Sequence, residues 1–326
     1  MVFNHPDEPL ELRELPIPQP SEYQVRIRVS ACGVCRTDQH IIEGDLDKPK
    51  IDLILGHEIV GYVDQIGAKV SQIKVGQRIG VPWLATSCKH CEFCQRGQEN
   101  LCHKAQFTGY HVDGGYAEYT LAHELACYQL PDGYSDTSLA PLMCAGLIGY
   151  RSYQMAGKCQ RIGLYGFGAA AHIICQIAVN QGVEVFAFTR PGDNAAQELA
   201  LNLGAVWAGD SSESLRDKLD AAIIYAPVGD LVPQALRQLK RGGKVICAGI
   251  HMSPIPQFNY EILWGERSIC SVANLTRQDG LDFLGIAGQL PIHIQTRVFP
   301  LQQANEAILL LQTGKLTGAA VLSIPD

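Results

Sequence analysis

The chain of 326 residues is long enough for two domains, each with its own buried core. Its formal net charge of -7 and pI near 5.8 lack the basic footprint of nucleic-acid-binding proteins, so we expect no nucleic-acid partner. No apolar run approaches the roughly 20 residues of a membrane helix, so we expect no membrane partner. Residues 1–8 have neither the basic start nor the apolar core of a signal peptide, and the twelve cysteines cluster at metal-binding spacings. Reduced metal ligands in a cytoplasmic protein are therefore expected.

The first half of the chain is predicted to form short strands. Apolar and charged side chains alternate over residues 22–30, which predicts a half-buried strand leading into a short helix after Cys35. Further short strands, punctuated by glycine, are expected within 53–67 and 77–81. Many short strands joined by Gly and Pro turns indicate a β-rich first domain.

Two potential metal ligands lie near these strands. Cys35 ends Ala31-Cys-Gly-Val-Cys, and His57 follows twenty-two residues later in Gly56-His-Glu. One thiolate, one imidazole and a third protein ligand would leave zinc an open position, which can polarise an alcohol or carbonyl oxygen. His57 alone would more often be an ordinary core histidine, but its neighbours Gly56 and Glu58 and the upstream Cys35 favour the ligand interpretation.

A second metal site is predicted within residues 88–102. Four cysteines are separated by two, two and seven residues, namely Cys88, Cys91, Cys94 and Cys102. Four thiolates saturate a tetrahedral zinc and leave no open position, so this site would be structural. The alternatives are four unrelated buried cysteines or an iron–sulfur cluster, but the bacterial cluster spacing ends in Cys-Pro and this segment does not.

The pattern changes to alternating strands and helices after Cys144. A strand at 161–165 is followed by Gly166-Phe-Gly168, a helical pattern from His172, and a strand at 183–188. This βαβ order is typical of a dinucleotide-binding fold. We expect further strands at 221–225, 243–248 and 268–272, helices at 194–202 and 231–240, and therefore a doubly wound parallel sheet. Gly166 and Gly168 would allow the backbone to approach a pyrophosphate at the helix N-terminus.

Taken together, the Cys-Gly-Val-Cys-x-Thr-Asp-x-His and Gly-His-Glu-x-x-Gly motifs resemble those of the zinc-dependent alcohol dehydrogenases of the medium-chain dehydrogenase/reductase superfamily. The resemblance runs from about Pro9 to the C-terminus. It implies an α/β protein with a GroES-like β-rich catalytic domain at 1–145 and 275–326 and a Rossmann coenzyme domain at 146–274. It also implies that the third catalytic zinc ligand is Cys144, in Pro141-Leu-Met-Cys-Ala-Gly.

The resemblance implies roles for the residues around the zinc. Glu58 would lie behind the metal, and Asp38 would fix the ring of His57. Thr37 would take the proton of the alcohol and pass it through the nicotinamide ribose to His40 and water. Thr37 and Asp38 could instead be only a helix N-cap and an acidic first turn, but this leaves His40 at the family's spacing unexplained. Arg36 would bind the cofactor pyrophosphate, with a surface arginine as the alternative.

The resemblance also predicts the nucleotide contacts and shows three departures from the family pattern. The expected contacts are Gly166, Phe167, Gly168, Ala169, Ala170, Thr189, Arg190, Ala248, Gly249 and Ile250. Thr189-Arg190 replaces the acidic residue that grips the ribose of NAD, which favours NADP over NAD. The departures are Ala171 in place of the third fingerprint glycine, Ile148 in place of a common Thr, and Ala319 in place of a pyrophosphate-binding Arg.

These observations predict a zinc-dependent alcohol dehydrogenase with two zinc ions per chain and NADP or NAD as coenzyme. It would interconvert primary alcohols and aldehydes, small-molecule substrates, as a homodimer or homotetramer. Trp83 would line a narrow alcohol pocket, with a core tryptophan as the alternative. The other functions considered are an NADPH-specific aldehyde reductase for bulkier substrates and a non-catalytic zinc protein that retains the fold.

Overall fold

The computed structural model describes residues 1–46, 49–314, 316 and 318–324. The chain forms two compact units, one of residues 1–147 and 274–326 and the other of residues 148–273. None of the helices in the described residues has the length and apolar character needed to cross a membrane.

The first unit is built on a seven-stranded sheet in the order β16-β17-β2-β4-β5-β9, with β8 also paired to β2. All its pairings are antiparallel except β16 with β17. The strands of this sheet are β2 (Gln24–Val34), β4 (Glu58–Ile66), β5 (Arg78–Val81), β8 (Tyr119–His123), β9 (Tyr128–Gln129), β16 (Thr296–Pro300) and β17 (Ala319–Ser323). Two small pairs are β1 (Val2–Phe3) with β3 (Leu53–Ile54), and β6 (Leu84–Thr86) with β7 (Gln106–Phe107).

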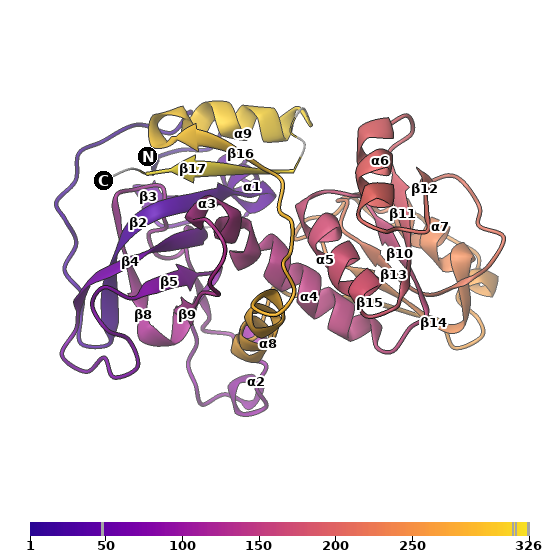
Figure 1. The fold of residues 1–326 in the computed structure, drawn as a ribbon, viewed down its shortest axis with the longest axis horizontal. Coiled ribbons are helices and arrows are strands. Elements are labelled where there is room, and N and C mark those ends of the chain that lie inside the picture. Colours follow the sequence, from indigo (N-terminus) through magenta and orange to yellow (C-terminus); the bar gives the residue numbers. More distant parts are fainter. Residues whose placement is uncertain (47–48, 315, 317, 325–326) are drawn as a thin grey trace. The chain divides into compact units, whose positions relative to one another are not determined.

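The predicted alternation of β2 is confirmed, because Val25, Ile27 and Val29 are buried and the arginines between them are only partly covered. The inward side chains join a core with residues of β4, β5 and helix α9. Helix α9 lies along β16 and β17 in Figure 1. The helices of this unit are α1 (Arg36–Ile42), α2 (Glu92–Gln95), η1 (Glu99–Leu101), η2 (Glu124–Ala126), α3 (Asp136–Leu139), η3 (Ala140–Met143), α8 (Arg277–Ala287), η5 (Leu301–Gln303) and α9 (Ala304–Gln312).

The second unit contains a six-stranded sheet in the order β12-β11-β10-β13-β14-β15, in which every pair is parallel. This confirms the predicted doubly wound sheet. Its strands are β10 (Arg161–Tyr165), β11 (Glu184–Thr189), β12 (Trp207–Asp210), β13 (Leu219–Ile224), β14 (Leu239–Cys247) and β15 (Ser268–Ser271). Its helices are α4 (Ala145–Ala156), which begins in the last residues of the first unit, α5 (Ala169–Asn180), α6 (Asn194–Asn202), α7 (Leu231–Gln238) and η4 (Tyr260–Ile262).

Strand order reverses between β10 and β13, the position where such sheets bind nucleotides. Helices α5 and α6 pack on β10, β11 and β12, whereas α7 packs on β13 and β14 (Figure 1). Right-handed crossovers running in opposite directions from β10 put these two sets on opposite faces. The buried rings of Tyr165 and Phe188 stack at 4.1 Å on the sheet face covered by α7.

Several element boundaries differ by a few residues from the sequence prediction, and two of these differences have a clear local cause. Helix α5 begins at Ala169 rather than His172, because Gly168 is extended and acts as the N-cap. Strand β14 begins at Leu239, where a helix was expected to continue to residue 240. Leu239 pairs with Leu219 before a register shift in the ladder, so pairing with β13 overrides the helical preference at this point.

Candidate metal centre and nucleotide site

A possible metal centre is formed by four buried or half-buried side chains of the first unit. The ligand atoms of Cys35, His57, Glu58 and Cys144 all lie within 4.8 Å of one another. The sulfur atoms of Cys35 and Cys144 are 3.7 Å apart. Two sulfurs bound to one tetrahedral zinc at about 2.3 Å would be about 3.8 Å apart. The thiols therefore already have the separation of two ligands of one ion.

The pairing of β2 with β4 brings the first ligands together. Gly33 lies opposite Glu58 in this ladder, so Cys35, just beyond the end of β2, lies near His57, just before β4. A Cβ atom on Gly33 would lie 1.7 Å from Oε2 of Glu58, so the buried carboxylate requires glycine at this position. Cys144 follows directly after η3, which packs against both strands.

Asp38 connects the two strands through its carboxylate, which is fully buried. It occupies the third position of α1, where Oδ2 accepts a hydrogen bond of 2.8 Å from the backbone N–H of Cys35. The same oxygen accepts a bond of 3.0 Å from the Tyr116 hydroxyl, and Oδ1 accepts one of 3.3 Å from the N–H of Gly56. The N-cap of α1 is therefore Cys35 rather than Thr37, whereas Asp38 lies in the acidic first turn as its position suggested. Asp38 is also a neighbour of His57, whose Nδ1 lies 3.4 Å from Oδ1.

Tyr116 was not identified from the sequence. It lies in a loop whose backbone bonds to Leu55 and Gly56, which brings the phenol to Asp38. Burial, and then the nearby Asp38 carboxylate, raise the pKa of Tyr116 well above its ordinary value, so the phenol remains a hydrogen-bond donor. The Gly-Gly-Tyr stretch offered no periodicity that would have singled it out.

The ring of His57 meets the requirement for a metal ligand. The residue is fully buried, Nδ1 has the 3.4 Å contact with Asp38, and Nε2 makes no hydrogen bond to any described residue. Burial alone would lower the pKa of His57, but the Asp38 carboxylate and the Cys35 thiol raise it well above its ordinary value. An unsatisfied buried nitrogen beside two sulfurs is the arrangement that a cation would complete.

Ionisation of one acidic group in this cluster makes ionisation of the others less favourable. The hydrogen bond from Cys144 lowers the pKa of Cys35 well below its ordinary value, and the same bond raises the pKa of Cys144. Burial, and then the charge of Cys35, raise the pKa of Glu58 well above its usual range. Without a cation only one thiol ionises readily, whereas a bound divalent ion would favour both thiolates.

Three further predicted residues lie on α1. Thr37 and His40 are buried, and Oγ1 of Thr37 lies 3.7 Å from the sulfur of Cys35. Since they are three positions apart, Thr37 and His40 share one face of the helix. Arg36 is exposed at the first position of α1. An exposed side chain is compatible with both of the interpretations considered for it.

Trp83 is a core residue and also a neighbour of the metal centre. Only 5% of its surface is exposed. Its indole stacks on Phe107 at 5.1 Å and on Tyr110 at 5.8 Å, and meets the His57 ring edge-on at 4.9 Å. Both the pocket and the core interpretations therefore remain compatible with its position. Phe107 and Tyr110 form an aromatic cluster with Trp83, and Phe107 was not identified from the sequence.

The four cysteines of the 88–102 segment also converge, with sulfur atoms within 4.8 Å of one another. The sulfurs of Cys88 and Cys91 lie 3.9 and 3.5 Å from that of Cys94. Backbone N–H groups point at the sulfurs of Cys88 and Cys102, as expected for thiolates. The N–H of His90, followed by other nearby donors, lowers the pKa of Cys88 to about 6, whereas burial raises that of Cys94 to about 11.

The second unit presents a glycine turn at the end of β10. Gly166 has φ +87°, and a Cβ atom there would lie 2.9 Å from that of Ala226. A Cβ on Gly168 would meet nothing within 4 Å, and this residue caps α5 without any side-chain bond. The backbone is therefore uncrowded at Gly168, directly before α5, which suits the approach of a pyrophosphate. Ala169 and Ala170 begin this helix, whereas the ring of Phe167 is buried.

The other predicted nucleotide contacts follow neighbouring strands of the same sheet. Ala248, Gly249 and Ile250 come directly after β14. Thr189 ends β11 and is buried, whereas Arg190 is exposed and forms a 3.2 Å ion pair with Asp193. Asp210 lies opposite Thr189 in the ladder, and the amide of Gln197 donates to both. Among the departures, Ala319 is a buried residue of β17.

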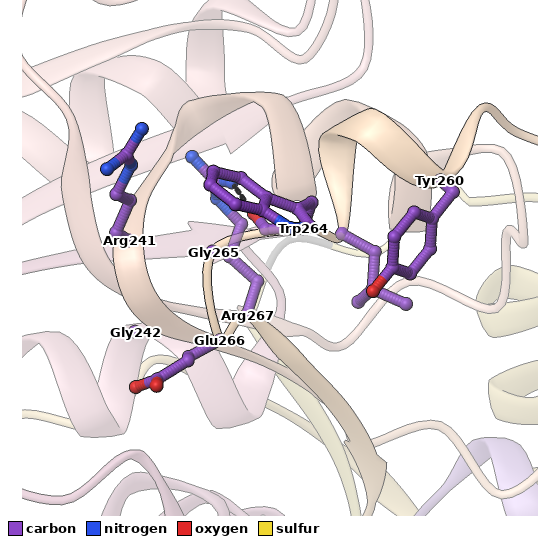
Figure 2. Close-up of a pocket in the computed structure, with 8 residues that line it drawn as sticks. Arg241, Gly242, Tyr260, Trp264, Gly265, Glu266 and Arg267 are labelled. Carbon is purple, nitrogen blue, oxygen red and sulfur yellow. Dashed lines mark hydrogen bonds between the residues drawn. The ribbon is translucent and has the colours of Figure 1, made fainter.

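Two other features of the described residues, a surface hollow and a third group of possible metal ligands, are weaker candidates for a functional site. An open hollow of about 750 Å³ is lined by Arg241, Tyr260, Trp264 and Arg267, with the Arg241 guanidinium 5.1 Å from the Trp264 ring (Figure 2). It contains neither the cysteine clusters nor the glycine turn. A third possible metal group, His40, Glu43 and Asp45, has two exposed carboxylates and is an ordinary feature of a helix end.

A unit with two candidate zinc-ligand sets, one of them with a histidine and two cysteines, together with a Rossmann-type sheet, is typical of metal- and nucleotide-dependent dehydrogenases. The profile described as "Alcohol dehydrogenase GroES-like domain" matches residues 21–132. The chain is 46% identical over 324 residues to a probable alcohol dehydrogenase AdhA of Mycobacterium tuberculosis, covering 97% of this chain and 93% of that one. It is 35% identical to an alcohol dehydrogenase of Geobacillus stearothermophilus, covering 97% of both.

Solved structures have the same architecture. The acetophenone reductase of Geotrichum candidum, solved in complex with NAD, superposes with a TM-score of 0.89 at 26% identity, over 99% of this chain and 96% of that one. The chain belongs to the alcohol dehydrogenase family. It combines a GroES-like domain with a Rossmann-like parallel-sheet domain, the fold class that the sequence predicted.

Proposed function

We propose that this chain is a zinc-dependent alcohol dehydrogenase that transfers hydride reversibly between a primary alcohol or aldehyde and a nicotinamide nucleotide. The observation that carries the proposal is the convergence of Cys35, His57 and Cys144, with a buried histidine whose Nε2 has no hydrogen-bond partner among the described residues. Relatives that the chain covers over 93% and 97% of their length are named alcohol dehydrogenases, or probable ones, which supports this reaction class.

Cys35, His57 and Cys144 would bind the catalytic zinc, and Cys88, Cys91, Cys94 and Cys102 would bind a second, structural zinc. The catalytic zinc, when bound, supplies Lewis acidity at an open coordination position. Asp38 holds the N–H groups around the site and orients His57. The carboxyl group of Glu58 stays buried among the ligands.

The chain's own residues would also move the proton. Thr37 can accept the alcohol proton at Oγ1, which lies beside the sulfur of Cys35. Its neighbour on the same helix face, His40, would pass that proton to water. A zinc protein without catalytic activity has no need for such a pair next to its metal, so these two residues argue against that alternative.

The second unit would hold the coenzyme, which supplies the hydride acceptor when bound. The N–H groups at the start of α5 suit the pyrophosphate, because no side chain caps this helix within the described residues and Gly166 and Gly168 place no side chain there. Arg190 has 73% of its side chain exposed, and its ion-pair partner among the described residues is the nearby Asp193, so its guanidinium is accessible to a 2′-phosphate. This supports a preference for NADP and also favours the NADPH-specific aldehyde reductase as the second candidate.

The self-association we propose is a homodimer or homotetramer. Strand β15 is the last strand of its sheet within the described residues, so one side of its backbone is available for pairing. Trp264 and Tyr260, just before it, have 55% and 68% of their surfaces exposed. Sedimentation analysis of the wild type and of Trp264→Glu tests this. We also propose a cytoplasmic location, supported by twelve cysteines that are all free.

Oxidation of NADPH and NADH with a panel of short, long and aromatic aldehydes tests the function. We expect turnover in the wild type and loss of it in Cys144→Ser, with the fold of both units retained. A protein that carries two zinc ions and binds the nucleotide but reduces none of the aldehydes would contradict the proposal. Turnover of bulky aldehydes only, and with NADPH only, would favour the second candidate.

A further inference from the structure

The C-terminal end of helix α1 carries an acidic residue back over the helix. Gly44 has φ +76°, and its N–H bonds to the carbonyl of Ile41. The N–H of Asp45 then bonds to the carbonyl of His40 at 2.9 Å. Glycine in the left-handed region followed by such a returning bond is the usual way in which a helix ends. It turns the chain so that the side chain of Asp45 lies next to His40.

The side chains meet as well as the backbones. Nδ1 of His40 lies 2.8 Å from Oδ2 of Asp45, with 11% of the imidazole and 35% of the carboxylate side chain exposed. A carboxylate only accepts hydrogen bonds, so Nδ1 must carry the hydrogen. In the neutral ring this leaves the lone pair on Nε2. His40 and Asp45 are joined by two hydrogen bonds, one between their backbones and one between their side chains.

We propose that Asp45 is a positioning residue for the proton relay, which keeps His40 in the tautomer that accepts a proton at Nε2. The inference rests on the proposed relay role of His40. Nε2 takes a proton from the relay, the ring becomes imidazolium, and the proton leaves from Nε2 to water while the Nδ1–H bond to Asp45 stays in place. No electron transfer or further reactant is involved.

Glu43 offers a matched comparison on the same helix end. Its carboxylate belongs to the same group of atoms within 4.8 Å. However, it accepts hydrogen bonds from the amides of Gln39 at 2.8 Å and Gln312 at 3.4 Å. It therefore has amide partners of its own, and we assign the control of the tautomer to Asp45 alone.

The first test does not depend on activity. Two-bond ¹H–¹⁵N spectra of ¹⁵N-histidine-labelled, zinc-loaded protein distinguish the two tautomers, with the His40 signals assigned from a His40→Asn variant. We expect hydrogen on Nδ1 in the wild type and in Glu43→Gln. In Asp45→Asn the amide can donate to Nδ1, so hydrogen should move to Nε2. A wild-type ring with hydrogen on Nε2 overturns the proposal.

The second test measures turnover at matched zinc content. We expect kcat to fall about 10- to 100-fold in Asp45→Asn, as for a general base held in the wrong tautomer. KM should stay nearly constant, Asp45→Glu should restore part of the rate, and Glu43→Gln should stay near the wild type. Equal losses in Asp45→Asn and Glu43→Gln would indicate a structural role only and overturn the proposal. If the tautomer shifts as expected but His40→Asn retains full activity, the relay in the proposed function is wrong, whereas the Asp45 contact is correct.

Discussion

The hydroxyl of Tyr116 donates a 3.0 Å hydrogen bond to Oδ2 of Asp38, and both side chains are fully buried. The two residues are 78 positions apart. This bond connects the glycine-rich loop before β8 to the helix that follows Cys35. It supports the carboxylate that lies beside His57.

Tyr116→Phe should weaken the catalytic zinc site. Asp38 would lose a donor, which for a charged acceptor costs about 1–3 kcal/mol of unfolding free energy, and the supporting contact of a ligand is worth about 10- to 100-fold in metal affinity. Chelator competition followed by zinc analysis, together with urea unfolding, measures both effects. Tyr165→Phe is the matched control, because Tyr165 is equally buried and its hydroxyl has no hydrogen-bond partner among the described residues. Zinc loss of the same size in both variants would assign no special role to Tyr116.

Zinc content should be two ions per chain. Cys94→Ser should lose one ion and a large part of the stability, because a closed four-thiolate site contributes folding free energy directly. Cys144→Ser should also retain one ion but keep most of the stability. Cys159→Ser, a change at a free cysteine outside both groups, should retain two. Elemental analysis of protein purified without chelator gives the counts, and a wild type with a single ion would contradict the assignment.

Metal removal should expose one strongly reactive thiol in the 88–102 segment. With a pKa of about 6, Cys88 is mostly thiolate at neutral pH, whereas Cys94, with a pKa of about 11, is mostly thiol. Since the thiolate is the nucleophile, alkylation of Cys88 should level off above about pH 7, and that of Cys94 should keep rising with pH. Mass spectrometry after iodoacetamide treatment measures both rates, and zinc should protect both residues. Similar rates for the two thiols across this range would be inconsistent with their different surroundings.

Arg190→Asp should weaken NADPH binding selectively. The change removes a guanidinium that can pair with the 2′-phosphate and adds a repelling charge, so we expect at least a tenfold loss, about 1.4 kcal/mol. NADH affinity should change little or improve. Arg216→Asp makes the same charge change at another exposed position of this unit and should affect neither nucleotide. Titrations that give equal NADPH and NADH affinities in the wild type, unchanged by Arg190→Asp, would mean that Arg190 faces only solvent.

Trp83→Ala should change substrate size preference. If the indole limits the space beside His57, its removal should improve kcat/KM for 2-propanol and benzyl alcohol relative to ethanol, at about 1–3 kcal/mol per methylene-sized group admitted. Trp83→Phe keeps a ring in the stack with Phe107 and should lie between the two. Uniform slowing of all alcohols with a loss of stability would instead identify a core tryptophan. The pocket wall would then be formed by other residues, such as Tyr110 or Leu275.

Features that depend on neighbouring residues could be predicted from the sequence. The cysteines at 88, 91, 94 and 102 lie within fifteen residues, so their spacing alone indicates one ion. The alternation of β2 and the glycine turn after β10 are equally local, because side-chain period and turn chemistry act over a few residues. Helix α6 was predicted with its observed bounds, since Asp193 caps it and its composition favours a helix.

Features that depend on distant residues were decided only by the tertiary structure. The link between Cys35 and Cys144 followed from a family resemblance, and only the packing of η3 against β2 and β4 accounts for the 3.7 Å between their sulfurs. Tyr116 contacts Asp38 because its loop bonds to the backbone of Leu55, and residue spacing in the sequence does not predict this contact. The start of β14 at Leu239 was likewise set by its pairing with β13. Local patterns fix which groups a segment offers, whereas burial and strand register determine which of them meet.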